Sequence, residues 1–398
     1  MGNSSLAIKL SKSAETAVKK GHPWIFEKSI TKGPANNPQA GSLCVLFDRS
    51  NNRPYAFGLW DPEEIIRIKV IAHDSKLQLS ETYWIEKLEV AKEKRKLLLH
   101  YVTGYRAIHG ENDGFPGLIL DIYDKVGVLK VYSKIWNPYL ETLIQAIPSI
   151  FQVESIVFRL NRKLEGSKEF AYQQGQVIGK KLSNERIPFS EYGVKFYAYP
   201  ISGHKTGFFL DQRPNRYWVQ QHAKEKTILD VFSYVGGFGI HGLKGGAKSL
   251  TSVDISSQAM DVAMENLLLN QLKIEKWHPL VGDAFKELEN LIQSRIVFDI
   301  VVIDPPSFAK QNSEVEVALK QYQRLAELGA KLTCKGGYLL LGSCSSRITL
   351  EDFKISHELA FQQTNTHWKI VNEILHDVDH PITYLEGIYL KTITYQKS

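Results

Sequence analysis

The 398-residue sequence has few cysteines and no long apolar run. Its three cysteines, Cys44, Cys334 and Cys344, stand at unrelated spacings, which excludes a disulfide framework and a Cys-x-x-Cys metal or redox motif. No stretch approaches the roughly 18 consecutive apolar residues of a membrane span, and the N-terminus lacks the apolar core of a signal peptide. The sequence therefore predicts a cytoplasmic protein without a membrane partner, in which any functional cysteine acts alone.

Internal repeats and low-complexity segments are also missing, and the composition (43% hydrophobic, 23% charged) is that of a globular protein. The formal net charge of +6 is uneven, because residues 1–200 hold 28 Lys and Arg against 21 Asp and Glu, and the remainder is nearly neutral. The N-terminal half is thus the candidate contact for a polyanion, although an excess of this size is also typical of a solvated surface.

Three parts differ in pattern, which agrees with the two or three domains expected at this length. Residues 1–78 contain short β-like segments separated by Asn, Pro and Gly turns. Residues 79–185 begin with a charged helix over 80–100 and continue as an α+β unit. Residues 186–398 alternate strands with helices near 237–245, 257–269, 284–293, 314–334 and 350–363, which predicts a parallel doubly wound sheet.

The segment "LDVFSYVGGFGIHGLKGGAK" (229–248) reads as a strand, a glycine turn and a helix. Gly237, Gly239 and Gly242 formally spell the G-x-G-x-x-G fingerprint of dinucleotide enzymes. Three acids at successive strand ends argue against a pyrophosphate ligand: Asp230, Asp254 and Asp283. All three are expected at the carboxyl edge of the sheet, where ligands of this fold bind.

S-adenosylmethionine suits such acids, because it carries a sulfonium and an ammonium and no phosphate. Asp230 is expected near its amino acid end, Asp254 at the ribose hydroxyls and Asp283 at the adenine amine, while Gly236 lets the backbone come close. Any one of these acids alone is as readily a cap or turn residue.

The next strand ends in "DPPSF", where paired prolines stiffen the backbone after Asp304. Methyltransferases that act on amino groups usually place an aromatic directly after the second proline, whereas this sequence has Ser307 there. Transfer to an exocyclic amine is therefore the weaker interpretation.

The fifth strand, "GGYLLLGSCS", ends at Cys344. A thiolate that adds to carbon 6 of a pyrimidine makes carbon 5 nucleophilic towards a sulfonium methyl group, and Asp304 at ring nitrogen 3 would stabilise the developing charge. The alternative is that Cys344 is a small buried hydrophobe, but flanking serines at a strand end favour a reactive thiol. Cys334, expected inside the preceding helix, and Cys44 are predicted to be packing residues.

On these residues the chain resembles the ribosomal RNA large subunit methyltransferase I family, which forms 5-methylcytosine in 23S ribosomal RNA. The resemblance runs nearly end to end through "GHPWIFEKSI", "GENDGFPGLILDIY", "GHKTGFFLDQRPNR", "DPPSF", "SCS" and "DHPITYLEGIYLK". It implies an N-terminal PUA-like RNA-binding domain (1–78), a central α+β domain (79–185) and a Rossmann-like, seven-stranded class I methyltransferase domain (186–398). RNA is the implied partner, and a homodimer is compatible with the family.

The resemblance implies that Cys344 is the nucleophile and Asp304 the motif acid. It implies cofactor contacts by Asp230, Ser233, Gly236, Asp254 and Asp283, with Thr206 and Asp211 closing the cofactor pocket, unless their segment is only a structural lead-in. Many related enzymes carry a second cysteine after the motif proline, where this chain has Ser307. The group that assists product release is thus unidentified.

Other features have two interpretations. His376, Asp377, Asp379 and His380 resemble a metal cluster in composition, but their spacing does not bring all four to one face, and no metal is expected. Trp24 and Phe26 either stack on RNA bases or pack in a core. Two functional alternatives remain: methylation of another position, such as a guanine nitrogen, with Cys344 a bystander, and a non-catalytic RNA-binding assembly factor.

Overall fold

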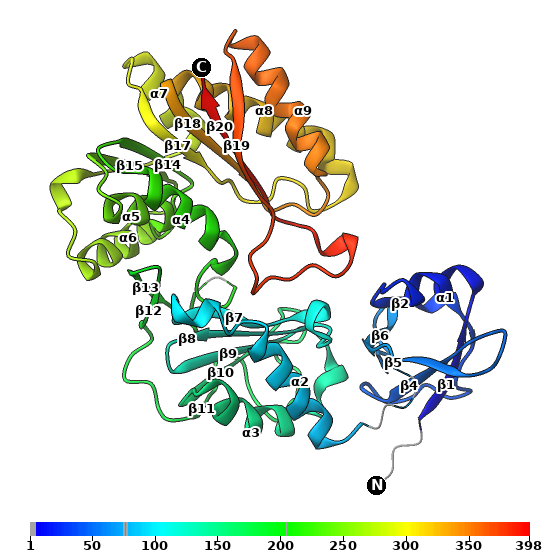
Figure 1. Ribbon diagram of the computed structural model, residues 1–398. Coiled ribbons are helices and arrows are strands. Elements are labelled where there is room, and N and C mark those ends of the chain that lie inside the picture. Colours follow the sequence, from blue (N-terminus) through cyan, green and yellow to red (C-terminus); the bar gives the residue numbers. More distant parts are fainter. Residues whose placement is uncertain (1–4, 75, 77–78, 204) are drawn as a thin grey trace. The chain divides into compact units, whose positions relative to one another are not determined.

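The computed structural model of the protein describes residues 5–74, 76, 79–203 and 205–398 (Figure 1). The chain forms two compact units. The N-terminal unit comprises Met1–Phe189, Ala198–Leu210 and Val378–Leu385, and the catalytic unit comprises Ser190–Tyr197, Asp211–Asp377 and Glu386–Ser398. The three-domain division at residues 78 and 185 stays a prediction. No helix in the described ranges is both long enough and apolar enough to cross a membrane.

The first part of the N-terminal unit is a six-stranded sheet with the order β2-β6-β5-β4-β1-β3 and a short helix, α1 (Lys12–Lys19). Alternate residues of β4 are buried, and Cys44 and Leu46 are fully covered. Cys44 is therefore a packing residue, as expected. The strands are β1 (Leu6–Leu10), β2 (Trp24–Phe26), β3 (Ile30–Lys32), β4 (Leu43–Phe47), β5 (Pro54–Trp60) and β6 (Ile66–Ala72).

The rest of the N-terminal unit is built on a five-stranded sheet with two helices packed on one face (Figure 1). Helix α2 (Glu81–Glu93) begins at Ser80, whose side chain accepts from the Tyr83 amide, and buries Trp84, Leu88 and Ala91 along one stripe. The other elements are α3 (Leu140–Phe151) and the strands β7 (Gly104–His109), β8 (Leu118–Tyr123), β9 (Val126–Val131), β10 (Ser155–Leu160) and β11 (Val177–Gly179).

Residues 378–385, although near the C-terminus, belong to the N-terminal unit because of buried polar contacts. The Asp379 carboxylate accepts from the Arg106 amide at 2.9 Å and from His380 Nδ1 at 2.8 Å. Its carbonyl accepts from Arg95, whose guanidinium also forms a two-bond ion pair with Asp113. Removing one partner of such a buried pair typically costs about 3–5 kcal/mol, so these residues have a structural role.

The catalytic unit contains a seven-stranded sheet with the order β16-β15-β14-β17-β18-β20-β19 (Figure 1). The strands from β14 to β18 are parallel, and β20 runs antiparallel between β18 and β19. The strands are β14 (Thr227–Val231), β15 (Ser249–Asp254), β16 (Trp277–Val281), β17 (Phe298–Ile303), β18 (Thr333–Ser343), β19 (Trp368–Ile374) and β20 (Lys391–Lys397). The predicted Rossmann-like class is confirmed.

Helices cover both faces of this sheet, so its central strands are apolar on both sides. Leu229 and Val231 pack with α7, α8 and α9, whereas Ile228 packs with α4, α5 and α6. The helices are α4 (Arg213–His222), α5 (Gly237–Lys244), α6 (Ser257–Leu269), α7 (Ala284–Gln293), α8 (Val315–Leu332) and α9 (Leu350–Gln363). A short pair of strands, β12 (Ile187–Glu191) and β13 (Val194–Ala198), spans the first passage of the chain between the units.

The prediction that Cys334 lies in a helix was wrong. Helix α8 ends at Leu332, and β18 begins at Thr333 with extended backbone angles, so that Cys334 is the second residue of the strand. Its thiol lies 3.6 Å from Asp299 Oδ1. The two glycines that follow, Gly336 and Gly337, interrupt the apolar pattern and hid the start of the strand from the sequence. Cys334 thus lies at the opposite end of β18 from Cys344.

Candidate active site

The carboxyl ends of the parallel strands bring the candidate residues to one edge of the sheet. Asp230 is the penultimate residue of β14, and Asp254 is the last residue of β15. Asp304 directly follows β17, and Cys344 directly follows β18. Ile303 pairs with Leu341 in the parallel ladder of β17 and β18, so Asp304 leaves the sheet next to Gly342, and Cys344 follows two residues further along the neighbouring strand.

Asp230 is the most perturbed of the acids. It is 1% exposed, and its Oδ2 accepts from the Gly239 amide at 2.9 Å. Burial raises the pKa of Asp230 to about 7, aided by the negative charges of Asp304 and Asp254 and opposed by the Gly239 amide. Oδ1 is buried and has no hydrogen-bond partner among the described residues. An unsatisfied carboxylate oxygen at a ligand-binding edge indicates that a cationic or hydrogen-bonding ligand completes it.

The loop between β14 and α5 is tightly turned. Phe232, Tyr234 and Gly236 have φ angles of 61°, 49° and 81°. Its Ser233 amide donates to the Val253 carbonyl at 3.1 Å, and the Ser233 hydroxyl lies 3.8 Å from the Met260 sulfur. These contacts fix the loop against β15 and α6.

The glycines of the formal dinucleotide fingerprint all lie within helix α5, and two of them, Gly239 and Gly242, permit close packing. A Cβ on Gly239 would lie 2.5 Å from the Leu250 side chain and 3.2 Å from Asp230 Oδ2. A Cβ on Gly242 would lie 2.3 Å from Ile228. The close approach of helix α5 to the sheet thus explains the glycine spacing, and no pyrophosphate ligand is needed to account for it.

Asp254 and Asp283 also perform local structural tasks. Asp254 accepts from the Tyr234 amide at 2.8 Å and from the Ser256 amide at 2.9 Å, which ties the loops after β14 and β15 together. Asp283 is exposed and caps α7 through the Lys286 amide at 3.1 Å. A carboxylate oxygen accepts more than one hydrogen bond, so these contacts are compatible with a ligand at the same edge.

Asp304 and Cys344 are supported by a glycine and two serines. A Cβ on Gly342 would lie 2.3 Å from Asp304 Oδ1, so the carboxyl group rests directly on this glycine. The expectation that the flanking serines serve the thiol was wrong. The Ser343 hydroxyl donates to the Tyr322 hydroxyl at 2.9 Å, and the Ser345 hydroxyl donates to the Ala309 carbonyl at 2.8 Å. The serines therefore order the loop around the half-buried Cys344.

Lys391 was missed by the sequence reasoning. It is the first residue of β20 and is 1% exposed, and its Nζ donates to the Ser345 carbonyl at 2.6 Å. Burial lowers the pKa of Lys391 to about 8, and the charge of Cys344 opposes this shift. The available signal was a lysine at the start of a strand-like segment, "LKTITY", predicted to close the sheet.

Thr206 and Asp211 fall in different units. Thr206 lies in the N-terminal unit, where its hydroxyl donates to Asp121, which is the contact expected of a structural lead-in. Asp211 lies in the catalytic unit and accepts from the Tyr389 hydroxyl at 2.8 Å. Their proposed role in closing a cofactor pocket stays a prediction.

Trp24 and Phe26 also differ. The Trp24 indole donates to Glu111 at 3.0 Å, and its ring packs against Tyr384, so Trp24 is held within the N-terminal unit. Phe26 is 43% exposed. The described part of the chain contains no group of three or more His, Cys, Asp or Glu side chains arranged to hold a metal ion.

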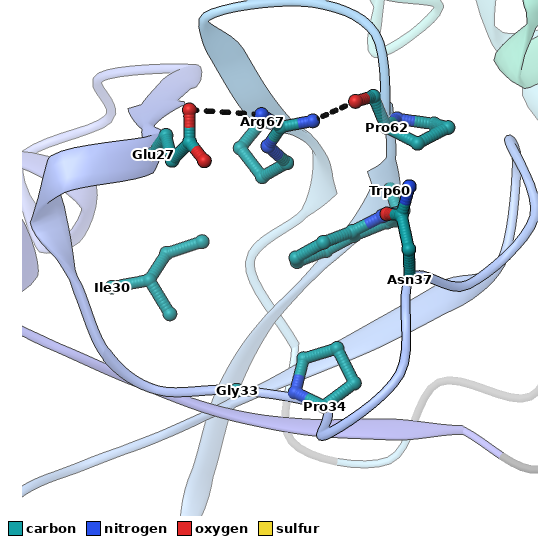
Figure 2. A pocket seen from close by; sticks show the side chains of 8 residues that line it. All are labelled: Glu27, Ile30, Gly33, Pro34, Asn37, Trp60, Pro62 and Arg67. Atoms are coloured by element: carbon teal, nitrogen blue, oxygen red, sulfur yellow. Dashed lines mark hydrogen bonds and ion pairs between the residues drawn. The ribbon is translucent and has the colours of Figure 1, made fainter.

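A cavity of about 420 Å³ lies in the N-terminal unit (Figure 2). Figure 2 shows Arg67 linked to Glu27, at 2.9 Å, and to the carbonyl of Pro62. Trp60 also lines the cavity, but its indole nitrogen is covered. The Arg67 guanidinium is thus bonded within the protein, and the edge of the large sheet is the better candidate for chemistry.

Comparisons with known proteins agree with this choice. The S-adenosylmethionine-dependent methyltransferase family matches residues 177–378, and a PUA-like domain family matches residues 8–73. A ribosomal RNA large subunit methyltransferase from Deinococcus radiodurans is 35% identical over 98% of this chain and 97% of its own length. A ribosomal RNA large subunit methyltransferase I from Aeromonas salmonicida is 35% identical over 97% of this chain and 98% of its own length.

Solved structures show the same fold. An S-adenosylmethionine-dependent methyltransferase from Streptococcus mutans has a TM-score of 0.81 at 21% identity and covers 98% of this chain and 99% of its own. A methyltransferase solved in complex with SAH has a TM-score of 0.83 at the same identity and coverage. The chain belongs to the ribosomal RNA large subunit methyltransferase I family of S-adenosylmethionine-dependent methyltransferases.

Proposed function

We propose that the protein methylates carbon 5 of a cytosine in 23S ribosomal RNA, in the cytoplasm, through a covalent adduct on Cys344. One observation carries the proposal: the half-buried thiol of Cys344 and the carboxyl group of Asp304 follow neighbouring parallel strands, beside the buried Asp230. A thiol and an acid placed together at the ligand-binding edge are what addition to a pyrimidine ring requires.

The hydrogen-bond acceptors at this edge fit S-adenosylmethionine. The unpartnered Oδ1 of Asp230 would accept from the ammonium group, with Ser233 and Gly236 in the adjoining loop. Asp254 would accept from the ribose hydroxyls and Asp283 from the adenine amine. When bound, the cofactor supplies an electrophilic methyl group on a sulfonium. A pyrophosphate would be repelled by Asp230 and its neighbours, which argues against a dinucleotide.

Replacing Asp230 by asparagine should weaken cofactor binding about 10- to 100-fold, the value of a hydrogen bond to a charged group. Because the pKa of Asp230 is raised to about 7, the carboxyl group is mostly protonated below that pH. A cationic ligand binds the ionised carboxylate, so binding below that pH should release a proton. Wild-type affinity should therefore rise about tenfold per unit between pH 5.5 and 7 and level off above it.

Calorimetry across this pH range, in buffers of different ionisation enthalpy, measures both effects. The Asp230→Asn variant should show weaker and flatter binding, whereas Asp261→Asn, which alters an exposed carboxylate on α6, should match the wild type. Unchanged affinity and pH dependence in Asp230→Asn would place the ammonium elsewhere.

In the proposed reaction Cys344 is the nucleophile and Asp304 is the acid at the pyrimidine ring. The Cys344 thiolate adds to carbon 6 of the cytosine, while the Asp304 carboxyl group shares a proton with ring nitrogen 3 through a hydrogen bond, so that the charge developing on the ring is stabilised. Carbon 5 would then be nucleophilic and would take the methyl group as its bond to the sulfonium breaks. A base, which the chain's residues leave unassigned, then removes the proton from carbon 5, and its electrons restore the ring double bond as the bond between carbon 6 and sulfur breaks, which releases 5-methylcytosine and the thiolate.

RNA as the substrate is supported by the PUA-like match, by the excess of positive charge in residues 1–200 and by the names of the relatives. The target base must leave its stack to reach Cys344, which costs a few kcal/mol that phosphate contacts would offset. Methylation of an exocyclic amine is less well supported, because Phe308 packs against Tyr322, with ring centroids 5.1 Å apart, and the residue directly after the prolines is Ser307.

A covalent trap tests the proposal directly. Protein, S-adenosylmethionine and large-subunit RNA containing 5-fluorocytosine should give a stable adduct, because fluorine at carbon 5 prevents the elimination step. Mass spectrometry should map the adduct to the peptide containing Cys344. Methyl transfer to ordinary RNA without any adduct would favour a nitrogen acceptor, and neither product with all large-subunit fragments would favour an assembly factor.

A further inference from the structure

Lys391 is anchored to the residues on both sides of Cys344, through its backbone to Ser343 and through its ammonium group to Ser345. In the β18–β20 ladder Lys391 pairs with Ser343, the residue before Cys344. Its Nζ donates at 2.6 Å to the carbonyl of Ser345, the residue after Cys344. The cation is therefore fixed beside the backbone that carries the thiol, by a ladder pairing and a hydrogen bond that do not depend on solvent.

This cation is buried without a carboxylate. Lys391 is 1% exposed, and in the described part of the chain its side chain bonds to the Ser345 carbonyl and forms no ion pair. Buried charges are normally paired, because an isolated one loses its hydration. The pKa of Lys391 is accordingly lowered to about 8, and the negative charge of Cys344 is the influence that raises it again.

The other titratable groups around Lys391 and Cys344 do not supply a second buried positive charge. Asp304, after β17, carries negative charge, and Tyr322, on α8, accepts from Ser343. His376, after β19, accepts from the Leu390 amide at 3.3 Å through Nε2. Arg347, in the loop after β18, is exposed to solvent. Lys391 is thus the buried cation of this set.

We propose that Lys391 is a positioning residue for the nucleophile: its ammonium fixes the loop of residues 343–345 and stabilises the negative charge of the Cys344 sulfur. Its role in turnover rests on the proposed function, because it matters to catalysis only if Cys344 attacks the base. Its effect on the thiol does not depend on RNA. A cation beside a cysteine favours the thiolate, which is the attacking form.

The ionisation of Cys344 can be measured in the full-length protein by iodoacetamide alkylation between pH 6 and 10, with each cysteine peptide quantified by mass spectrometry. In the wild type, Cys344 should show a midpoint below the ordinary value of about 8.5. Lys391→Met should move this midpoint upwards by about one unit, and Lys391→Arg, which keeps the charge, should restore most of the shift.

Lys397 provides a matched control on the same strand. Its Nζ also donates to backbone carbonyls, those of Ala330 and Thr333, at the other end of the sheet near Cys334. Lys397→Met should therefore shift the midpoint of Cys334 and leave that of Cys344 unchanged. In methylation assays Lys391→Met should lower kcat and move the pH optimum upwards, with KM for RNA unchanged.

A wild-type Cys344 midpoint at or above 8.5 overturns the proposal even if Lys391→Met fails to fold. An unchanged midpoint in a folded Lys391→Met protein overturns it as well. The proposed function fails separately: if the midpoint shifts but 5-fluorocytosine gives no adduct, Lys391 stabilises a thiolate that is not the nucleophile.

Discussion

Replacing Cys344 by alanine should reduce methyl transfer to large-subunit RNA by at least about a thousandfold, because the covalent route to an activated carbon 5 is then closed. The fold should persist. The side chain is small and half-buried, and the loop around it is held by Ser343, Ser345 and Lys391. Cofactor affinity should stay within about twofold of the wild type, because the cofactor contacts are assigned to Asp230, Asp254 and Asp283.

The measurement is transfer of radiolabelled methyl groups under single-turnover conditions, with calorimetry for the cofactor. Cys334→Ala is the matched control, because Cys334 belongs to the same strand and lies at its other end; it should retain wild-type transfer. If Cys344→Ala kept a tenth or more of the wild-type rate, a ring nitrogen would become the favoured acceptor.

Replacing Asp304 by alanine should lower kcat by about 10²- to 10³-fold, the usual loss when a group that stabilises developing charge is removed. The change creates no strain, since the carboxyl group rests on Gly342 and alanine only leaves that space open. Adduct formation with 5-fluorocytosine RNA should slow in parallel, because protonation at ring nitrogen 3 belongs to the addition step.

A second consequence concerns Asp230, whose pKa is raised in part by the charge of Asp304. In Asp304→Ala this pKa should fall, and the rise of cofactor affinity with pH should level off at a lower pH than in the wild type. Calorimetry detects the change independently of turnover. A kcat within threefold of the wild type would remove Asp304 from the mechanism, whatever the calorimetric result.

Much of the catalytic sheet was predictable, because strand and helix alternation depends on short-range periodicity. The helices predicted near 257–269, 284–293 and 350–363 agree with α6, α7 and α9. The end of α8 and the start of β18 were not predictable, because Gly336 and Gly337 break the apolar pattern inside the strand. Local patterns locate an element, but the pairing with β17 decides where it begins.

Part of the candidate site was predictable from the sequence, and part was not. Asp230, Asp254, Asp304 and Cys344 were identified because each ends an apolar strand, and parallel strands deliver their ends to one edge. The directions of the Ser343 and Ser345 hydroxyls were not predictable, because Tyr322 and Ala309 come from an earlier helix and loop.

The sequence by itself determined the fold class, the cofactor type and the residues at the strand ends, since these follow from local periodicity and residue chemistry. The tertiary structure alone decided that Lys391 lies beside Cys344 and that residues 378–385 belong to the N-terminal unit. The physical reason is that β20 enters the sheet antiparallel, next to β18, almost fifty residues after Cys344. Such a neighbour is set by long-range pairing and burial, which no local pattern contains.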